Sequence, residues 1–203
     1  GADLAGIASG ACQFYGFCTA PEGQAQWFIR NAPRRRGSRP PGLDMEWNPV
    51  APTCQRRPDA ATIRAEMQRW LDIVFFNYAA RTEIYTTPGF YKDAQLNRLN
   101  GYEFWLRTTA KTPRQAYPGQ PWRFWQHTAT RTLPNTPGDV DINAFNATRA
   151  EWDAWLAAPA PQGPHPTPPS PPAPGRRDRT PPVDSPRNPP GTPPTARAAA
   201  RPG

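Results

Sequence analysis

Tryptophan and proline divide this chain into two unlike parts. All eight tryptophans lie at or before Trp155, whereas residues 159–203 hold 17 of the 30 prolines. The second part has almost no large apolar side chain to offset the entropy cost of ordering it. We therefore expect one folded domain over residues 1–158 and a disordered Pro/Arg-rich tail over residues 159–203. No stretch approaches ~20 apolar residues, so no membrane span is expected.

The formal net charge of +8 can attract nucleic acid, anionic lipid or anionic cell-wall polymer. The same positive charge can also serve solubility alone. No nucleic-acid-binding motif accompanies it, so we predict no nucleic-acid partner. In the tail, a segment such as Pro168–Pro172 could form polyproline II and dock on an aromatic groove, although a flexible linker is the simpler interpretation.

The chain has three cysteines, Cys12, Cys18 and Cys54, and only two histidines. Neither a CxxC pair nor clustered histidines are present, so we predict no metal and no cofactor. Cys18 and Cys54 each follow a strand-like segment and are the candidate disulfide pair, which would imply an oxidising compartment. Cys12 lies inside a strand-like run and is expected to be a buried thiol. The sequence is also compatible with three free thiols.

Strand-like and helix-like segments alternate along the folded part. Helices are predicted after the capping-box pattern Thr19–Glu22, from Asp59 along an apolar stripe to Tyr78, from Pro88 to about Leu99, and after Thr148–Glu151. The predicted strands are residues 10–17, 42–47, 82–87, 103–108, 122–128 and 139–142. This alternation predicts an α/β fold with a parallel sheet and right-handed crossovers.

A complete (β/α) barrel usually needs eight strands and ~250 residues. We therefore interpret the six strands as an irregular TIM-like (β/α) barrel that lacks its first two strands. Residues 1–9 look like the end of a helix that runs into a strand, and we expect that the chain begins inside a longer protein. The lack of a visible signal peptide then decides nothing about export.

Parallel barrels carry their sites at the carboxyl ends of the strands, where this sequence places Asp44 and Glu46. Residues i and i+2 of a strand point the same way, ~6.5–7 Å apart at the backbone. Two carboxylates at that range raise at least one pKa, so one group can stay protonated and act as a general acid. Glycoside hydrolysis needs such a pair. The same pattern also fits a strand end that forms salt bridges with arginines.

Later strands add further candidates. Asp141 belongs to an alternating acidic run, Asp139–Asn143, which around a closed barrel could approach the first pair but which also fits a turn. Trp125 and Gln126 offer an aromatic face and an amide for gripping a sugar ring. Trp105 and Tyr85 could do the same, and all these aromatics could instead be core.

Six segments together resemble glycoside hydrolase family 25, the lysozymes of the N-acetylmuramidase type. They are QAQWFI (24–29), PPGLDMEW (40–47), EIYTTPGFY (83–91), FWLR (104–107), FWQHT (124–128) and GDVDINAFN (138–146). The resemblance spans residues 1 to about 157, in order and without a large gap. Any one of these segments alone would be a weak match.

The resemblance implies cleavage of the β-1,4 bond between N-acetylmuramic acid and N-acetylglucosamine in peptidoglycan. Glu46 matches the general acid and Asp44 its acidic partner. Asp141 matches a last-strand carboxylate of the cleft, and Tyr85 a hydrogen-bond donor near the reacting sugar. The expected substrate-binding residues are Trp105, Trp125, Gln126 and Phe14. The implied protein is a secreted or periplasmic enzyme, and we expect a monomer.

Two departures from the family pattern bear on activity. The family's opening strand with its catalytic-site Asp has no counterpart here, and the usual Tyr-His-Phe of the third strand is replaced by Cys12, Gln13 and Phe14. We therefore expect weak activity or none from this chain. A glycan-binding protein that no longer hydrolyses its ligand is the alternative, which the intact Asp44 and Glu46 pair disfavours.

Overall fold

The structure, a computed structural model, describes residues 5–32 and 38–157. The predicted tail over 159–203 lies outside the described residues. The described strands are β1 (Cys12–Phe14), β2 (Gly42–Met45), β3 (Glu83–Thr86), β4 (Glu103–Arg107), β5 (Phe124–Leu133) and β6 (Thr136–Phe145). The described helices are α1 (Pro21–Asn31), α2 (Ala60–Tyr78), α3 (Pro88–Asp93), the 3-10 turn Leu96–Arg98, α4 (Pro113–Ala116) and α5 (Arg149–Ala157).

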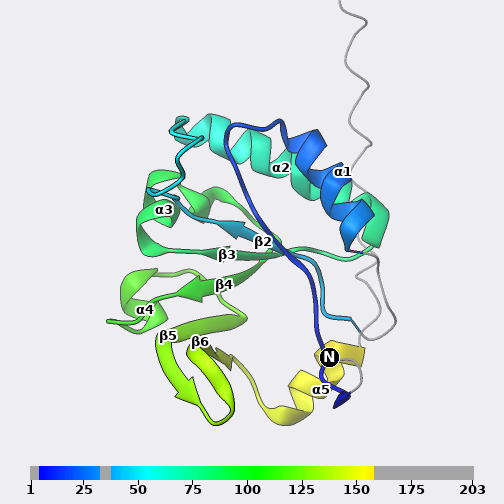
Figure 1. The fold of residues 1–203 in the computed structure, drawn as a ribbon, viewed down its shortest axis with the longest axis vertical. Coiled ribbons are helices and arrows are strands. Elements are labelled where there is room, and N and C mark those ends of the chain that lie inside the picture. The colour runs from blue at the N-terminus through cyan, green and yellow to red at the C-terminus, as the bar shows by residue number, and fades with distance from the viewer. Residues whose placement is uncertain (1–4, 33–37, 158–203) are drawn as a thin grey trace, which may run out of the picture. The chain divides into compact units, whose positions relative to one another are not determined.

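The strands form one mixed sheet in the order β1-β2-β3-β4-β5-β6, which confirms the predicted α/β class (Figure 1). Neighbours from β1 to β5 pair in parallel, and for β1 to β4 this was predicted from the helices between the strands. The last pair differs from the prediction, because β6 runs antiparallel to β5. A two-residue turn joins these strands, and so short a connection allows only an antiparallel neighbour.

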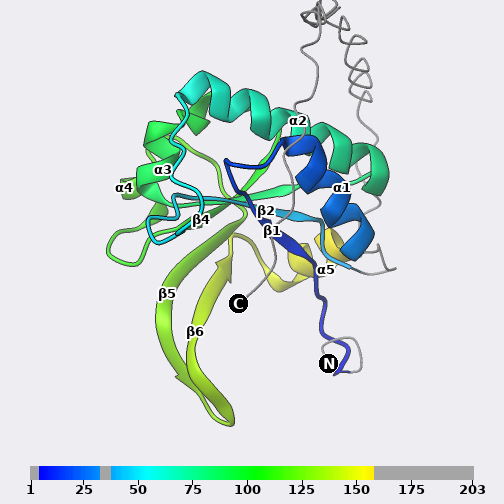
Figure 2. The same ribbon diagram turned by 45° about the horizontal axis from the view of Figure 1, so that its top comes forward.

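The β5–β6 turn explains why the hairpin is longer than the two short strands predicted there. Asn135 has a φ of 60°, and Leu133 pairs with Thr136 across Pro134 and Asn135. Proline followed by a residue in the left-handed region is the signature of a tight turn, and Asn tolerates that region. Figure 2 shows the hairpin curving away from the other strands, and its outer residues are exposed.

Helices α1 and α2 cover one face of the sheet (Figure 1). Six of the seven residues of the predicted α2 stripe are buried, namely Ile63, Met67, Trp70, Leu71, Val74 and Tyr78. The seventh, Phe75, is half-buried. Alternate residues of the strands meet this stripe, among them the fully buried Leu43, Ile84 and Phe104. This helix-covered face is the hydrophobic core of the described residues.

Side-chain caps mark where α2 and α5 begin. Asp59 caps α2 by accepting hydrogen bonds from the amides of Ala61 and Thr62, and Thr148 with Glu151 forms the predicted capping box of α5. The capping box predicted at Thr19 is wrong. The cap residue of α1 is Ala20, without a side-chain cap.

The side chain of Gln24, instead of that of Thr19, hydrogen-bonds to the loop before α1. Its side-chain amide donates to the carbonyls of Gly16 and Thr19, and its oxygen accepts from the Gly16 amide at 2.9 Å. A buried glutamine that satisfies three backbone groups makes a hydroxyl cap unnecessary.

Helix α5 packs against β5 and β6 through aromatic rings. Trp152 and Trp155 contact both Phe124 and Phe145, with ring centroids 5.1–6.0 Å apart. The Trp155 indole also donates to Glu103 at 3.0 Å, so one hydrogen bond accompanies the packing. The chain after the hairpin is thereby returned to the sheet.

Cys18 and Cys54 form a disulfide that joins the loop after β1 to the loop before α2. Cys12 is free and exposed, so its predicted burial is wrong. The reason is its place on β1, an outer strand of the sheet with only β2 beside it among the described residues. Within that same part of the chain, no helix is both long and apolar enough to cross a membrane.

Candidate active site on the sheet

The two faces of β2 carry different chemistry. Leu43 and Met45 are fully buried against the helices, whereas Asp44 and Glu46 alternate with them and are half-buried on the other face. Side chains two apart on a strand share a face, so both carboxyls lie on what we call the site face. Glu46 directly follows β2 and stands at the carboxyl end of the strand.

The strand register builds a row across the site face. Five side chains occupy successive aligned positions of β1 to β5: Phe14, Asp44, Tyr85, Trp105 and Phe124. The rings of Tyr85 and Trp105 meet edge to face with centroids 5.4 Å apart. One carboxyl is therefore flanked by aromatic side chains, with Phe14 41% exposed at the outer strand.

The backbone around Asp44 is firmly held. Its carbonyl accepts a hydrogen bond from the Tyr15 amide at 3.0 Å, and the next carbonyl, that of Met45, accepts from the Thr86 hydroxyl at 2.9 Å. The Asp44 carboxyl lacks one hydrogen bond, because its buried Oδ1 has no partner among the described residues. A buried acceptor without a donor favours the protonated form of the acid.

The pKa values of Asp44 and Glu46 are both shifted toward the protonated form. Burial, with Glu46 as the second cause, raises the pKa of Asp44 from 3.8 to about 7. Burial also raises the pKa of Glu46, while Arg107 lowers it and Asp141 raises it. Two neighbouring carboxyls with raised pKa values can hold a proton near neutral pH.

Tyr85 belongs to the same electrostatic group. Burial first, then Glu46 and Asp44, raise the pKa of its phenol, and Arg107 lowers it while Asp141 raises it further. The phenol therefore stays protonated and can donate a hydrogen bond at any physiological pH. The predicted residues Asp44, Glu46, Tyr85 and Asp141 are brought into mutual electrostatic range.

Arg107 is the residue of this group that sequence reasoning missed. It ends β4 two positions after Trp105 and is aligned with Gln126 and, through it, with Asn143 of β6. The signal was present, because strand alternation puts Arg107 on the face of Trp105. Its guanidinium is the positive charge beside Glu46.

The remaining candidates divide between the two faces. Gln126 is buried on the site face, and Trp105 is fixed there by a 2.7 Å hydrogen bond from its indole to Asn143. Trp125 is aligned with the core residue Leu106 and donates to the Thr108 carbonyl at 2.8 Å. The structure therefore does not bring Trp125 to the row of Asp44, because neighbours of Phe124 and Gln126 on the strand must point the other way.

No group of three or more His, Cys, Asp or Glu side chains suited to a metal ion occurs within residues 5–32 and 38–157. The site face offers carboxyls, a phenol, an amide and aromatic rings. That set can bind a polar, ring-shaped ligand and transfer a proton to it.

Comparison with known proteins points to one family. The model of glycosyl hydrolases family 25 matches residues 1–136. Lysozyme M1 from Streptomyces globisporus is 30% identical over 161 residues, which cover 72% of this chain and 52% of that protein. The chain spans about half the length of the curated relatives it matches.

Solved structures give the same result. A bacterial lysozyme from Streptomyces coelicolor has 26% sequence identity and a TM-score of 0.65, over 76% of this chain and 75% of that one. A family 25 glycosyl hydrolase from Bacillus anthracis has 24% identity and a TM-score of 0.68, over 76% of this chain and 71% of that one. The family-model match over residues 1–136 and these likenesses agree, and the chain belongs to glycosyl hydrolases family 25.

Proposed function

We propose that this protein hydrolyses peptidoglycan at the β-1,4 bond between N-acetylmuramic acid and N-acetylglucosamine. The observation that carries the proposal is the Asp44 and Glu46 pair, two half-buried carboxyls with raised pKa values on one face of β2. Family membership and the lysozyme relatives support the same reaction.

In the proposed reaction Glu46 is the general acid that protonates the oxygen of the leaving sugar. Protonated Asp44 would orient the acetamido group of the substrate, and ionised Asp44 would stabilise the positive charge that develops on the sugar ring. Asp141 is the further carboxylate of the cleft, and Tyr85 donates a hydrogen bond near the reacting sugar. Arg107 limits the rise of the Glu46 pKa, which keeps the acid strong enough to give up its proton.

The glycan would lie along the site face, with Trp105 and Phe14 as apolar surfaces and Gln126 as a polar contact. We leave Trp125 out of this role because of its place on the other face. We further propose that the curled sheet is one side of an irregular TIM-like barrel, that the protein acts as a monomer outside the cytoplasm, and that residues 159–203 are a linker. The Cys18–Cys54 disulfide supports an oxidising compartment.

Digestion of purified peptidoglycan tests the proposal, with the products read by mass spectrometry. We expect fragments that end in reducing N-acetylmuramic acid, formed slowly. Glu46→Gln should abolish them, while Glu22→Gln on α1, away from the site face, should leave the rate unchanged. Fragments that end in reducing N-acetylglucosamine would assign a different bond.

A glycan-binding role without hydrolysis is the second candidate, favoured by the exposed Phe14 and by Cys12 and Gln13 on the outer strand. Co-sedimentation with the cell wall that survives in Glu46→Gln, without any products from the parent chain, would establish it over hydrolysis.

A further inference from the structure

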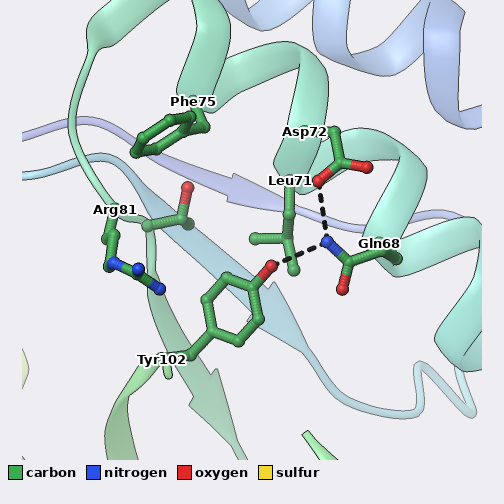
Figure 3. A pocket seen from close by; sticks show the side chains of 7 residues that line it. Gln68, Leu71, Asp72, Phe75, Arg81 and Tyr102 are labelled. Carbon is green, nitrogen blue, oxygen red and sulfur yellow. Dashed lines mark hydrogen bonds between the residues drawn. The ribbon is translucent and has the colours of Figure 1, made fainter. Parts of the chain in front are cut away.

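A pocket lies at the end of the sheet opposite to the candidate active site. It lies at the amino ends of β3 and β4, where Thr82 and Tyr102 directly precede the strands, and α2 forms its other wall (Figure 3). The candidate active site is at the carboxyl ends of the strands, so the two sites share no lining residue. The pocket measures about 170 Å³.

Two opposite charges line this pocket without pairing. Figure 3 shows Arg81 on one side and Asp72 on the other, with Leu71 and the ring of Tyr102 between them. Among the described residues, no ion pair joins these two side chains or joins either of them to a third residue. Both act on the Tyr102 phenol, since Asp72 raises its pKa and Arg81 lowers it, after the larger effect of burial.

Existing hydrogen bonds hold both charges in place. Gln68 donates to Asp72 at 2.7 Å and to the Tyr102 hydroxyl at 2.8 Å, and Arg81 donates to the Gly101 carbonyl. Each charged group keeps unused capacity, because a guanidinium has five N–H donors and a carboxylate about four acceptor positions.

Thr82 gives an independent sign of an unfilled polar site. It is 2% exposed, it lines the pocket, and its buried Oγ1 has no partner among the described residues. Buried hydroxyls are almost always hydrogen-bonded, so an orphan one that lines a cavity indicates a missing partner. Leu71 and Phe75 supply an apolar wall beside it.

We propose that this pocket binds a small zwitterion of amino-acid size. Its carboxylate would lie on Arg81, its ammonium on Asp72, and its short side chain against Leu71 and Phe75. Cavities of about 150 Å³ hold a six-carbon ring, so the volume suits a molecule of about six non-hydrogen atoms. A ligand with both charges neutralises both walls at once, which a simple anion or cation cannot do.

Titration of the 203-residue chain with D-alanine, L-alanine and glycine, followed by amide NMR shifts, tests this. We expect saturable shifts, in the millimolar range, at Arg81 and Tyr102 and at the Gln68 side-chain amide. Acetate and ethylammonium, which each carry one charge, should bind at least tenfold more weakly. Equal binding of acetate would reduce the pocket to an anion site and overturn the proposal, as would the absence of saturable shifts.

Variants separate binding from folding. Arg81→Gln and Asp72→Asn should each weaken alanine binding at least tenfold, and Arg81→Lys should restore part of it. Arg149→Gln on the exposed face of α5 is the matched control and should bind as the parent does. Dispersed spectra of each variant establish that it is folded. Unchanged binding in both pocket variants would overturn the proposal, and none of these results depends on hydrolysis of peptidoglycan.

Discussion

At the scale of single residues, the carboxyl of Asp44 links the candidate site to stability. Its pKa is about 7 in the folded protein and ordinarily 3.8, so the folded state binds more protons than the unfolded state between these values. Stability therefore falls as the pH rises through that window. Asp44, which supports the proposed chemistry, therefore destabilises the folded protein at alkaline pH.

Asp44→Asn should remove this destabilisation. At about 1.4 kcal/mol per pKa unit, and discounted because Asp44 is only half-buried, we expect a gain of about 1–2 kcal/mol near pH 8 and almost none near pH 4. Urea unfolding at both pH values measures it. Glu83, whose pKa burial also raises to about 7, keeps part of the pH dependence in the variant. An equal gain at both pH values would contradict the assignment.

Arg107 offers a second prediction. Because its charge lowers the pKa of Glu46, Arg107→Gln should raise that pKa and keep the carboxyl protonated to higher pH. A carbon-13 NMR titration of the glutamate carboxyls gives the pKa directly, and the alkaline limb of any hydrolysis profile should move the same way. Arg149→Gln is the control. A Glu46 titration that is unchanged or moves to lower pH would disprove the coupling.

The candidate residues differ in how far the sequence could reveal them. Asp44 and Glu46 were predictable because i, i+2 alternation on a strand is a local rule. Strand alternation puts Arg107 on the face of Trp105, but its place beside Glu46 depends on how strands far apart in the sequence are aligned, which no local pattern contains. Trp125 was assigned by its neighbours in sequence, although the same alternation rule places it opposite Gln126.

At the scale of elements, α5 is held by a small number of side chains. Its residues are exposed or half-buried and none is fully buried, so the packing of Trp152 and Trp155 and the hydrogen bond to Glu103 supply most of its attachment. The capping box at Thr148 and Glu151 fixes where the helix begins.

Trp155→Phe keeps an aromatic ring and removes the indole donor. We expect a loss of about 1–2 kcal/mol, because a hydrogen bond to a charged group is lost and Glu103 keeps only the two hydrogen bonds from Arg123, at 2.9 and 2.6 Å. Trp27→Phe on α1 removes an exposed indole and should change stability by less than about 0.5 kcal/mol. Thermal unfolding compares them, and similar losses in both would show that the Glu103 contact stabilises nothing.

Elements built on apolar periodicity were predictable, and those built on a turn were not. The stripe of α2 and the strands β2 to β4 follow patterns of 3.6 and 2 residues that burial enforces. The outer half of the β5–β6 hairpin is exposed, so no such pattern marks it. Its length depends on Pro134 and Asn135, whose turn was not recognised in the sequence. Helix α4, with its Thr112 and Gln115 capping box, was missed because it has only four residues.

At the scale of the whole chain, the Cys18–Cys54 disulfide closes a loop of 36 residues. Constraining the unfolded chain over that separation should stabilise the folded state by about 3–4 kcal/mol. The double variant Cys18→Ser, Cys54→Ser should lose that amount in urea unfolding and become insensitive to reducing agent. Cys12→Ser is the control, since that thiol is free and exposed. Equal stability of parent and double variant would mean that the bond does not form in solution.

The hairpin has a consequence for hydrogen exchange. Its outer residues are exposed, and the β5–β6 register shifts at three places between Gln126 and Leu133. Such segments open without global unfolding, so amides from about Arg131 to Val140 should exchange well before those of β3 and β4. Asp141 borders this segment. On heating, the candidate site should therefore lose one of its carboxyls while the sheet under Asp44 is still folded, and function would end at a lower temperature than structure.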